Sequence, residues 1–144
     1  MADGREPHGL ALLVCDYVYI DPYTGKRSVH GIFSTFLADA FPVPLPACAV
    51  YAAITECHPP VTLRIRVIDA NEEHDPIFEA QGVVTAADPL AVLELNFAVA
   101  GMTIPSPGEY RVQLFAGDHP ILERRMMVID NTASRNTEPG SGDE

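Results

Sequence analysis

The sequence lacks tryptophan and has very little basic charge. It contains a single lysine, Lys26, and its nine basic residues face twenty acidic ones, which gives a formal net charge of −11. Proteins bind nucleic acids and anionic membrane surfaces through clusters of lysine and arginine that meet phosphate groups. We therefore expect neither nucleic acid nor a membrane among the partners of this chain.

Long apolar runs and paired cysteines are missing as well. No stretch approaches the roughly 18 apolar residues of a membrane-spanning helix, and the run at 10–15 is too short for a secretory signal. Cys15, Cys48 and Cys57 are odd in number and show no CxxC spacing, which argues against a disulfide framework and a structural zinc site. The sequence predicts buried thiols and a cytoplasmic location.

Motifs for nucleotides, cofactors and nucleophilic catalysis are also absent. The sequence has no GxGxxG, no P-loop and no GxSxG, and its five histidines show neither HExxH nor HxH spacing. We expect no organic cofactor.

The residues that are present favour an all-β fold. Hydrophobic residues make up 47% of the chain, and 13 prolines and 10 glycines punctuate it, as is typical of many short strands joined by turns. Apolar runs and period-two alternation predict eight strands, at 10–20, 26–37, 48–56, 61–69, 77–85, 93–99, 110–115 and 121–129. The expected fold is a two-sheet immunoglobulin-like sandwich.

Gly108 and Tyr110 support this fold. A glycine two residues before a tyrosine that enters a late strand is common in immunoglobulin-like sandwiches, where the tyrosine hydroxyl bonds back to the preceding corner. We assign both residues a structural role.

The strand pattern also sets the expected domain limits. Residues 1–9 are predicted to be a flexible lead-in, 10–129 the sandwich, and 130–144 a disordered acidic tail. The prolines within 41–46 predict an extended connector, and Gly31 predicts a bulge or a close backbone approach within the second strand.

The acidic turn from Asp69 to Asp75 is the candidate metal site. Asp69, Asn71 and Glu73 have the alternating oxygen spacing that opens a calcium loop, and Asp75 adds a carboxylate. An EF-hand match fails after them, because His74 replaces the required glycine and Ala80 the bidentate glutamate. Calcium is the ion expected if this loop binds a metal.

A hydrolase is a further alternative, with Asp16 or Cys15 as the working group. Asp16 is the most unusual acid of the chain, because apolar residues surround it in the sequence. It could pair with Asp21, and Cys15 could pair with His30. The structural interpretation of Asp16, a side chain bonded to nearby backbone or facing water, is preferred.

Several short stretches together resemble a bacterial family of small uncharacterised β-sandwich proteins. The matching stretches are LVCDY at 13–17, TGK at 24–26, GIF at 31–33, VID at 67–69, and the hairpin that starts with PGEY at 107–110 and extends to Val128. The resemblance covers roughly residues 10–129. It implies the sandwich fold and no catalytic residue, because the family carries no assigned activity.

The leading hypothesis is a non-catalytic protein-interaction or scaffolding module. Function in such a sandwich resides in loops or sheet edges, and the candidate loops are Asp21–Gly25, Asp69–Asp75 and Gly117–Pro120. Pairing of edge strands with a protein partner or with a second copy is the other expected mode. A calcium-binding or small-ligand-binding domain is the first alternative, and an unrecognised hydrolase is the second.

Overall fold

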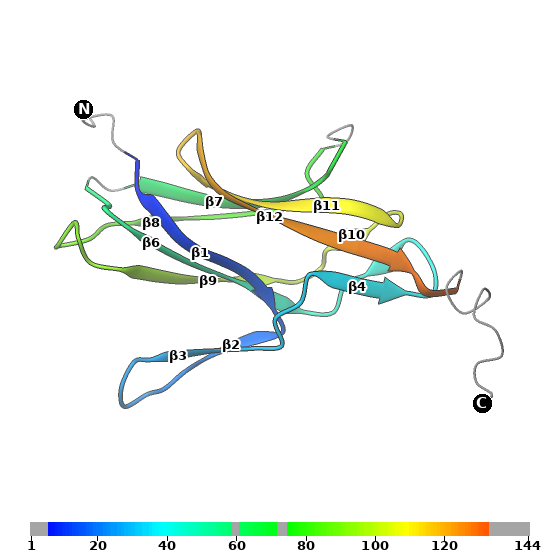
Figure 1. Cartoon of the computed structure of the whole chain (residues 1–144), viewed down its shortest axis with the longest axis horizontal. Helices are drawn as coiled ribbons and strands as arrows, with labels where there is room; N and C mark the ends of the chain where they lie inside the picture. The colour runs from blue at the N-terminus through cyan, green and yellow to red at the C-terminus, as the bar shows by residue number, and fades with distance from the viewer. Residues whose placement is uncertain (1–5, 59–60, 72–74, 133–144) are drawn as a thin grey trace.

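The elements of the described chain are all β-strands. The computed structural model describes residues 6–58, 61–71 and 75–132, and twelve strands lie in these ranges (Figure 1). They are β1 (His8–Cys15), β2 (Tyr17–Ile20), β3 (Arg27–His30), β4 (Thr35–Ala38), β5 (Val43–Pro44), β6 (Cys48–Thr55), β7 (Val61–Asp69), β8 (Phe78–Val84), β9 (Leu93–Val99), β10 (Thr103–Ile104), β11 (Gly108–Ala116) and β12 (His119–Asp130).

Most of these strands belong to two sheets that pack face to face. The larger sheet has the order β4-β12-β11-β7-β8, and the smaller has the order β1-β6-β9. Neighbouring strands are antiparallel except β4 and β12, which run parallel. In Figure 1, β7, β11 and β12 lie above β6 and β9, and buried side chains from both sheets form one core. The predicted all-β sandwich is confirmed.

The core forms because the long strands alternate apolar and polar side chains. On β7, Leu63, Ile65 and Val67 are almost fully buried. Arg64 and Arg66 stand between them and therefore point to the opposite face of the sheet. The smaller sheet meets these side chains with Val50, Ala52 and Ile54 of β6 and with Phe97 and Val99 of β9.

Tyr110 forms the predicted tyrosine corner at the start of β11. Its side chain is 1% exposed, and its hydroxyl donates a hydrogen bond to the carbonyl oxygen of Ser106 at 2.6 Å. Gly108, two residues earlier, has a φ of 148°, which favours glycine. The bond fixes the corner that leads into β11, and a hydrogen bond of this kind contributes about 1 kcal/mol to stability.

The strand order also agrees with an immunoglobulin-like domain. Consecutive neighbours β7, β11 and β12 correspond to the C, F and G strands of such domains. Val112, two residues after Tyr110, stands where antibody domains have the second cysteine of their inter-sheet disulfide. Val112 is buried in the same core as Val50 and Val67, so aliphatic contacts hold the sheets together at this point.

The count of strands is larger than predicted, because two predicted strands are each divided and the short strands β5 and β10 were not predicted. The first, at 10–20, breaks at Asp16, whose backbone N–H donates to the carbonyl oxygens of His30 at 2.9 Å and Gly31 at 3.1 Å. The second breaks at Gly31, whose φ is +70°. Between these breaks β2 and β3 form a separate antiparallel hairpin, after which the chain enters the larger sheet as β4.

The predicted connector and domain ends also differ from the structure. Val43 and Pro44 form β5, which pairs with β10; a proline is accepted at such a short edge because its carbonyl still accepts a hydrogen bond. β1 begins at His8, within the segment expected as a lead-in, and β12 ends at Asp130, the first residue of the predicted tail. Residues 133–144, the rest of that tail, lie outside the described residues.

Candidate functional site

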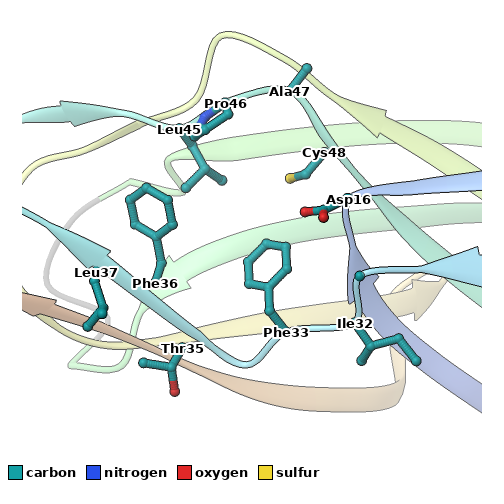
Figure 2. A pocket seen from close by; sticks show the side chains of 11 residues that line it. Asp16, Ile32, Phe33, Thr35, Phe36, Leu37, Leu45, Pro46, Ala47 and Cys48 are labelled. Carbon is teal, nitrogen blue, oxygen red and sulfur yellow. The ribbon is translucent and has the colours of Figure 1, made fainter.

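A groove opens at one side of the sandwich, where β4 faces the segment that leads into β6. Its volume is about 430 Å³, which is within the range of known ligand sites, roughly 300–1,000 Å³. We call it the β4 groove; it is lined by Asp16, Gly31, Ile32, Phe33, Thr35, Phe36, Leu37, Leu45, Pro46, Ala47 and Cys48. Figure 2 shows Phe36 beside Leu45, and Asp16 at the opposite end beside Phe33.

One wall of the groove is the open edge of β4. Thr35 pairs with Met127 of β12 in parallel register, and the carbonyl of Ser34 accepts the backbone N–H of Met127 at 2.9 Å. Because the backbone groups of successive residues in a strand point to alternate sides, those of Thr35 and Leu37 point away from β12. In the described ranges no strand pairs with this side of β4. The groove is thus bordered by backbone donors and acceptors that a further strand could use.

The side chains that line the groove are mainly apolar. Phe33 and Phe36 are half-buried and pack against the core, and Leu45 is buried. Ile32 and Leu37 are 53% and 55% exposed. The groove therefore presents a floor that is continuous with the core and a rim of large apolar side chains open to water.

Asp16 places a carboxylate at the mouth of this apolar surface. Gly31 makes room for it, since a Cβ added to Gly31 would lie 2.2 Å from Oδ2 of Asp16. The side chain of Asp16 is exposed, and within the described residues its carboxylate has neither a hydrogen-bond donor nor a salt-bridge partner. Asp16 is therefore an available negative charge next to apolar side chains.

The charge of Asp16 affects the two nearest thiols. Burial, and then the negative charge of Asp16, raise the pKa of Cys15. The pKa of Cys48, which lines the groove, is raised by burial, by Cys15 and by Asp16. Both side chains are consequently neutral thiols at physiological pH.

The hairpin β2–β3 carries exposed aromatic side chains next to the groove. The ring of Tyr17 stacks on the imidazole of His30, with centroids 4.6 Å apart. Tyr19, two residues along the same face, is exposed, and Tyr23 in the turn is 95% exposed. Tyrosines on one face are frequent in protein-binding surfaces, because a large rigid ring carries a polar end.

An ion pair holds this hairpin against β9. Arg27 of β3 contacts Glu94 at 3.0 Å, and Glu94 also accepts a short hydrogen bond from the hydroxyl of Tyr51 on β6. Burial and the adjacent Glu94 raise the pKa of Tyr51 to about 12. The hydrogen bond from Tyr51 is the main cause that lowers the pKa of Glu94, and Arg27 adds to it against the effect of burial.

The candidate calcium loop is only partly described. The carboxylate of Asp69 accepts the backbone N–H of Asn71 at 2.8 Å, which is a local turn contact. A polar pocket of about 220 Å³ lies between these two residues and the corner that includes Glu109. Glu73 lies outside the described residues, and no group of three metal-binding side chains occurs among those described, Asp75 included. Calcium binding by Asp69, Asn71, Glu73 and Asp75 stays a prediction.

The pairs considered for a hydrolase are not brought together. Cys15 is fully buried and donates to the carbonyl of Ala49, with sulfur and oxygen 3.6 Å apart, whereas His30 stacks on Tyr17. Asp16 and Asp21 lie before and after β2. The carboxylate of Asp21 accepts the backbone N–H of Tyr23 at 2.9 Å and so stabilises the turn.

Sequence reasoning identified Asp16 as unusual but missed the groove in which it lies. The groove joins three segments, at 16, 31–37 and 45–48, that no periodic pattern links. The available signals were Gly31 and the proline-rich stretch 41–46, since both interrupt regular strands next to the groove.

Comparisons with known proteins identify relatives but no activity. The model of a family of unknown function, DUF6941, matches residues 10–129. A solved immunoglobulin-like protein from Pseudomonas aeruginosa aligns with 17% identity and a TM-score of 0.41, covering 89% of this chain and 100% of its own. No curated protein matches the chain. Among the described residues there is no helix of the length and apolarity needed to cross a membrane.

Proposed function

The chain belongs to DUF6941, a family of unknown function, and we propose that it is a non-catalytic protein-interaction module that binds an extended segment of a partner in the β4 groove. The observation that carries this proposal is the coincidence of an unpaired strand edge with an apolar groove of about 430 Å³. A peptide that adds a strand to such an edge gains affinity from backbone hydrogen bonds and specificity from side-chain pockets.

The geometry of β4 supports binding by strand addition. The outward backbone groups of Thr35 and Leu37 offer a ladder to an incoming strand, and every second side chain of that strand would point to the same face. Phe33, Phe36 and Leu45 supply an apolar surface for one such side chain. Leu37, whose side chain lies on the opposite face of β4 from Phe36 (Figure 2), would gain a cross-strand neighbour from the added strand, so binding would remove apolar area from water.

A cytoplasmic role in a bacterial cell completes the proposal. The three cysteines are buried thiols and not disulfides, which suits a reducing compartment. The net charge of −11 favours partners that carry basic residues.

The test uses two substitutions at Leu37. Leu37→Pro removes the backbone N–H that faces the groove and leaves the ladder with β12 in place, whereas Leu37→Ala removes only the side chain. Partners would be captured by crosslinking in lysate of the source organism, and thermal unfolding would check that each variant folds. We expect the wild type to capture a stoichiometric partner. Leu37→Ala should capture the same partner at reduced yield, and Leu37→Pro should not capture it. Equal capture by the proline variant would rule out strand addition at β4.

Calcium binding by the Asp69–Asp75 loop is a second candidate function. The polar pocket beside Asp69, Asn71 and Glu109 is the observation in its favour, because carboxylate and amide oxygens are the ligands that calcium prefers. Millimolar calcium would raise the melting temperature of the wild type but not that of Asp69→Asn. An unchanged melting temperature in the wild type would exclude this function.

A further inference from the structure

The β4 groove has a feature that strand addition alone does not require, namely the carboxylate of Asp16. It lies at the end of the groove next to Phe33, away from Leu45 (Figure 2). No side chain of the described residues neutralises it. Arg27, on the neighbouring hairpin, is already paired with Glu94. Among the described residues, the carboxylate of Asp16 is thus left open to a positive charge from a partner.

The backbone holds Asp16 in place independently of its side chain. The N–H of Asp16 bonds to the carbonyls of His30 and Gly31, and the N–H of Phe33 donates to the carbonyl of Val14 at 2.9 Å. The absence of a Cβ at Gly31 keeps space open for the carboxylate. The carboxylate is therefore positioned without being used in the fold, which is the arrangement expected of a binding group.

From this geometry we infer that the partner segment carries a lysine or arginine that pairs with Asp16 and an apolar residue two positions away that fills the pocket between Phe36 and Leu45. This inference rests on the proposed function, because it takes the segment to be an added strand. Side chains two positions apart in a strand lie on the same face, about 6.5 Å from each other. One residue can thus meet the carboxylate while the other enters the apolar part of the groove.

The basic group of the partner has a defined energetic role in this mode of binding. Pairing with an exposed carboxylate contributes modest affinity and is weakened by salt. The apolar residue and the backbone ladder supply most of the affinity, whereas Asp16 discriminates between segments. An acidic residue at the same place would be repelled by Asp16 and by the negative charge of the whole chain.

The test uses labelled heptapeptides of alternating valine and threonine with a central phenylalanine. One peptide has lysine two positions from the phenylalanine, the second has norleucine there, and the third has glutamate. Fluorescence anisotropy would measure the binding of each to the full chain at low and high salt. The protein variants are Asp16→Asn, which keeps the shape of the side chain, and Leu37→Pro.

We expect the lysine peptide to bind the wild type about two- to fivefold more tightly than the norleucine peptide at low salt, and the glutamate peptide to bind most weakly. In Asp16→Asn the advantage of lysine over norleucine should fall to the small part that the negative charge of the rest of the chain supplies. Leu37→Pro should weaken the binding of all three. High salt should reduce the advantage of lysine and leave the binding of the norleucine peptide unchanged.

Other outcomes separate this inference from the proposed function. Equal binding of lysine and norleucine peptides to the wild type, with loss of both in Leu37→Pro, would overturn the role of Asp16 and leave strand addition intact. A lysine advantage of the same size in Asp16→Asn as in the wild type would also overturn the role of Asp16. Failure of every peptide to bind would overturn both the role of Asp16 and strand addition at β4. Sedimentation would also show whether the wild type forms a dimer that Leu37→Pro does not form. Such a dimer would assign the groove to a second copy of the chain and overturn the inference of a partner segment with a basic residue.

Discussion

The two halves of β12 meet their neighbours in opposite ways. The first half packs against β1 of the other sheet so closely that a Cβ on Gly9 would lie 2.5 Å from Cγ of Leu122. Arg124 crosses the same seam and donates to the carbonyl of Leu12 at 3.3 Å. The second half pairs with β4, and the far edge of β4 is open along the groove. One flank of the sandwich thus contains a closed contact between β1 and β12, which we call the seam, and the open edge of β4.

The difference shows how a sandwich protects one edge and leaves another usable. At the seam, a glycine permits close approach and a long arginine reaches a carbonyl of the neighbouring edge, so no room is left for a further strand. At the groove, the absence of a Cβ on Gly31 leaves space for the carboxylate of Asp16 and not for a neighbouring strand. The same residue type therefore closes the flank in one place and keeps it open in the other.

The largest expected effect comes from breaking the seam with Gly9→Val. The added side chain would overlap Leu122 and Ile121, and overpacking of this kind costs about 1–3 kcal/mol. Urea unfolding would measure the loss. Gly82→Val is the matched control in a strand, because a Cβ there has nothing within 4 Å. If Gly9→Val and Gly82→Val had equal stability, the seam would not be tightly packed.

Gly31→Ala should have a smaller effect on stability and a separate effect on binding. Its φ of +70° makes a Cβ unfavourable by roughly 1–2 kcal/mol, and the Cβ would displace the carboxylate of Asp16. Gly25→Ala is the control, since Gly25 has a φ of +74° and a Cβ added there would have no neighbour within 4 Å. We expect both variants to lose similar stability in thermal unfolding, and only Gly31→Ala to lose the lysine preference. If Gly31→Ala kept the lysine preference, Gly31 would have no part in positioning the carboxylate of Asp16 for binding.

The smallest expected effect concerns the ion pair that holds the hairpin next to the groove. Because the folded pKa of Glu94 is lowered, its contribution to stability is present above its unfolded pKa, about 4.3, and is lost as the pH falls through the folded value. Glu94→Gln should therefore cost up to about 1 kcal/mol at pH 7. The difference from the wild type should vanish near pH 2. Urea unfolding at both pH values checks this, and a difference that stays constant with pH would contradict it.

The parts of the fold with clear alternation were predictable from the sequence. β7 has the predicted bounds, and Tyr110 makes the predicted corner bond, because each depends on residues that are close in sequence. The divisions at Asp16 and Gly31 were not predictable in the same way. The apolar run at 10–20 resumes after Asp16, and one acid among apolar residues does not by itself show that the chain leaves the smaller sheet there.

The candidate site was predictable only in its parts. Asp16 stood out because a carboxylate interrupts apolar residues, and the sequence named sheet edges as binding surfaces. The groove itself depends on β4 joining the larger sheet through a parallel pairing with β12, and sequence patterns carry little information about such long-range pairings. Leu37 and Phe36 consequently looked like ordinary strand residues.

Cys48 gives the groove a chemical reporter of its own occupancy. Its thiol lines the groove yet is almost completely shielded from water, so an alkylating reagent reaches it only when the groove opens transiently. Cys15 is shielded by the sheet to which it belongs. A segment bound along β4 would slow the labelling of Cys48 relative to that of Cys15. The ratio of the two labelling rates would therefore measure how far the groove is occupied, with no substitution in the chain.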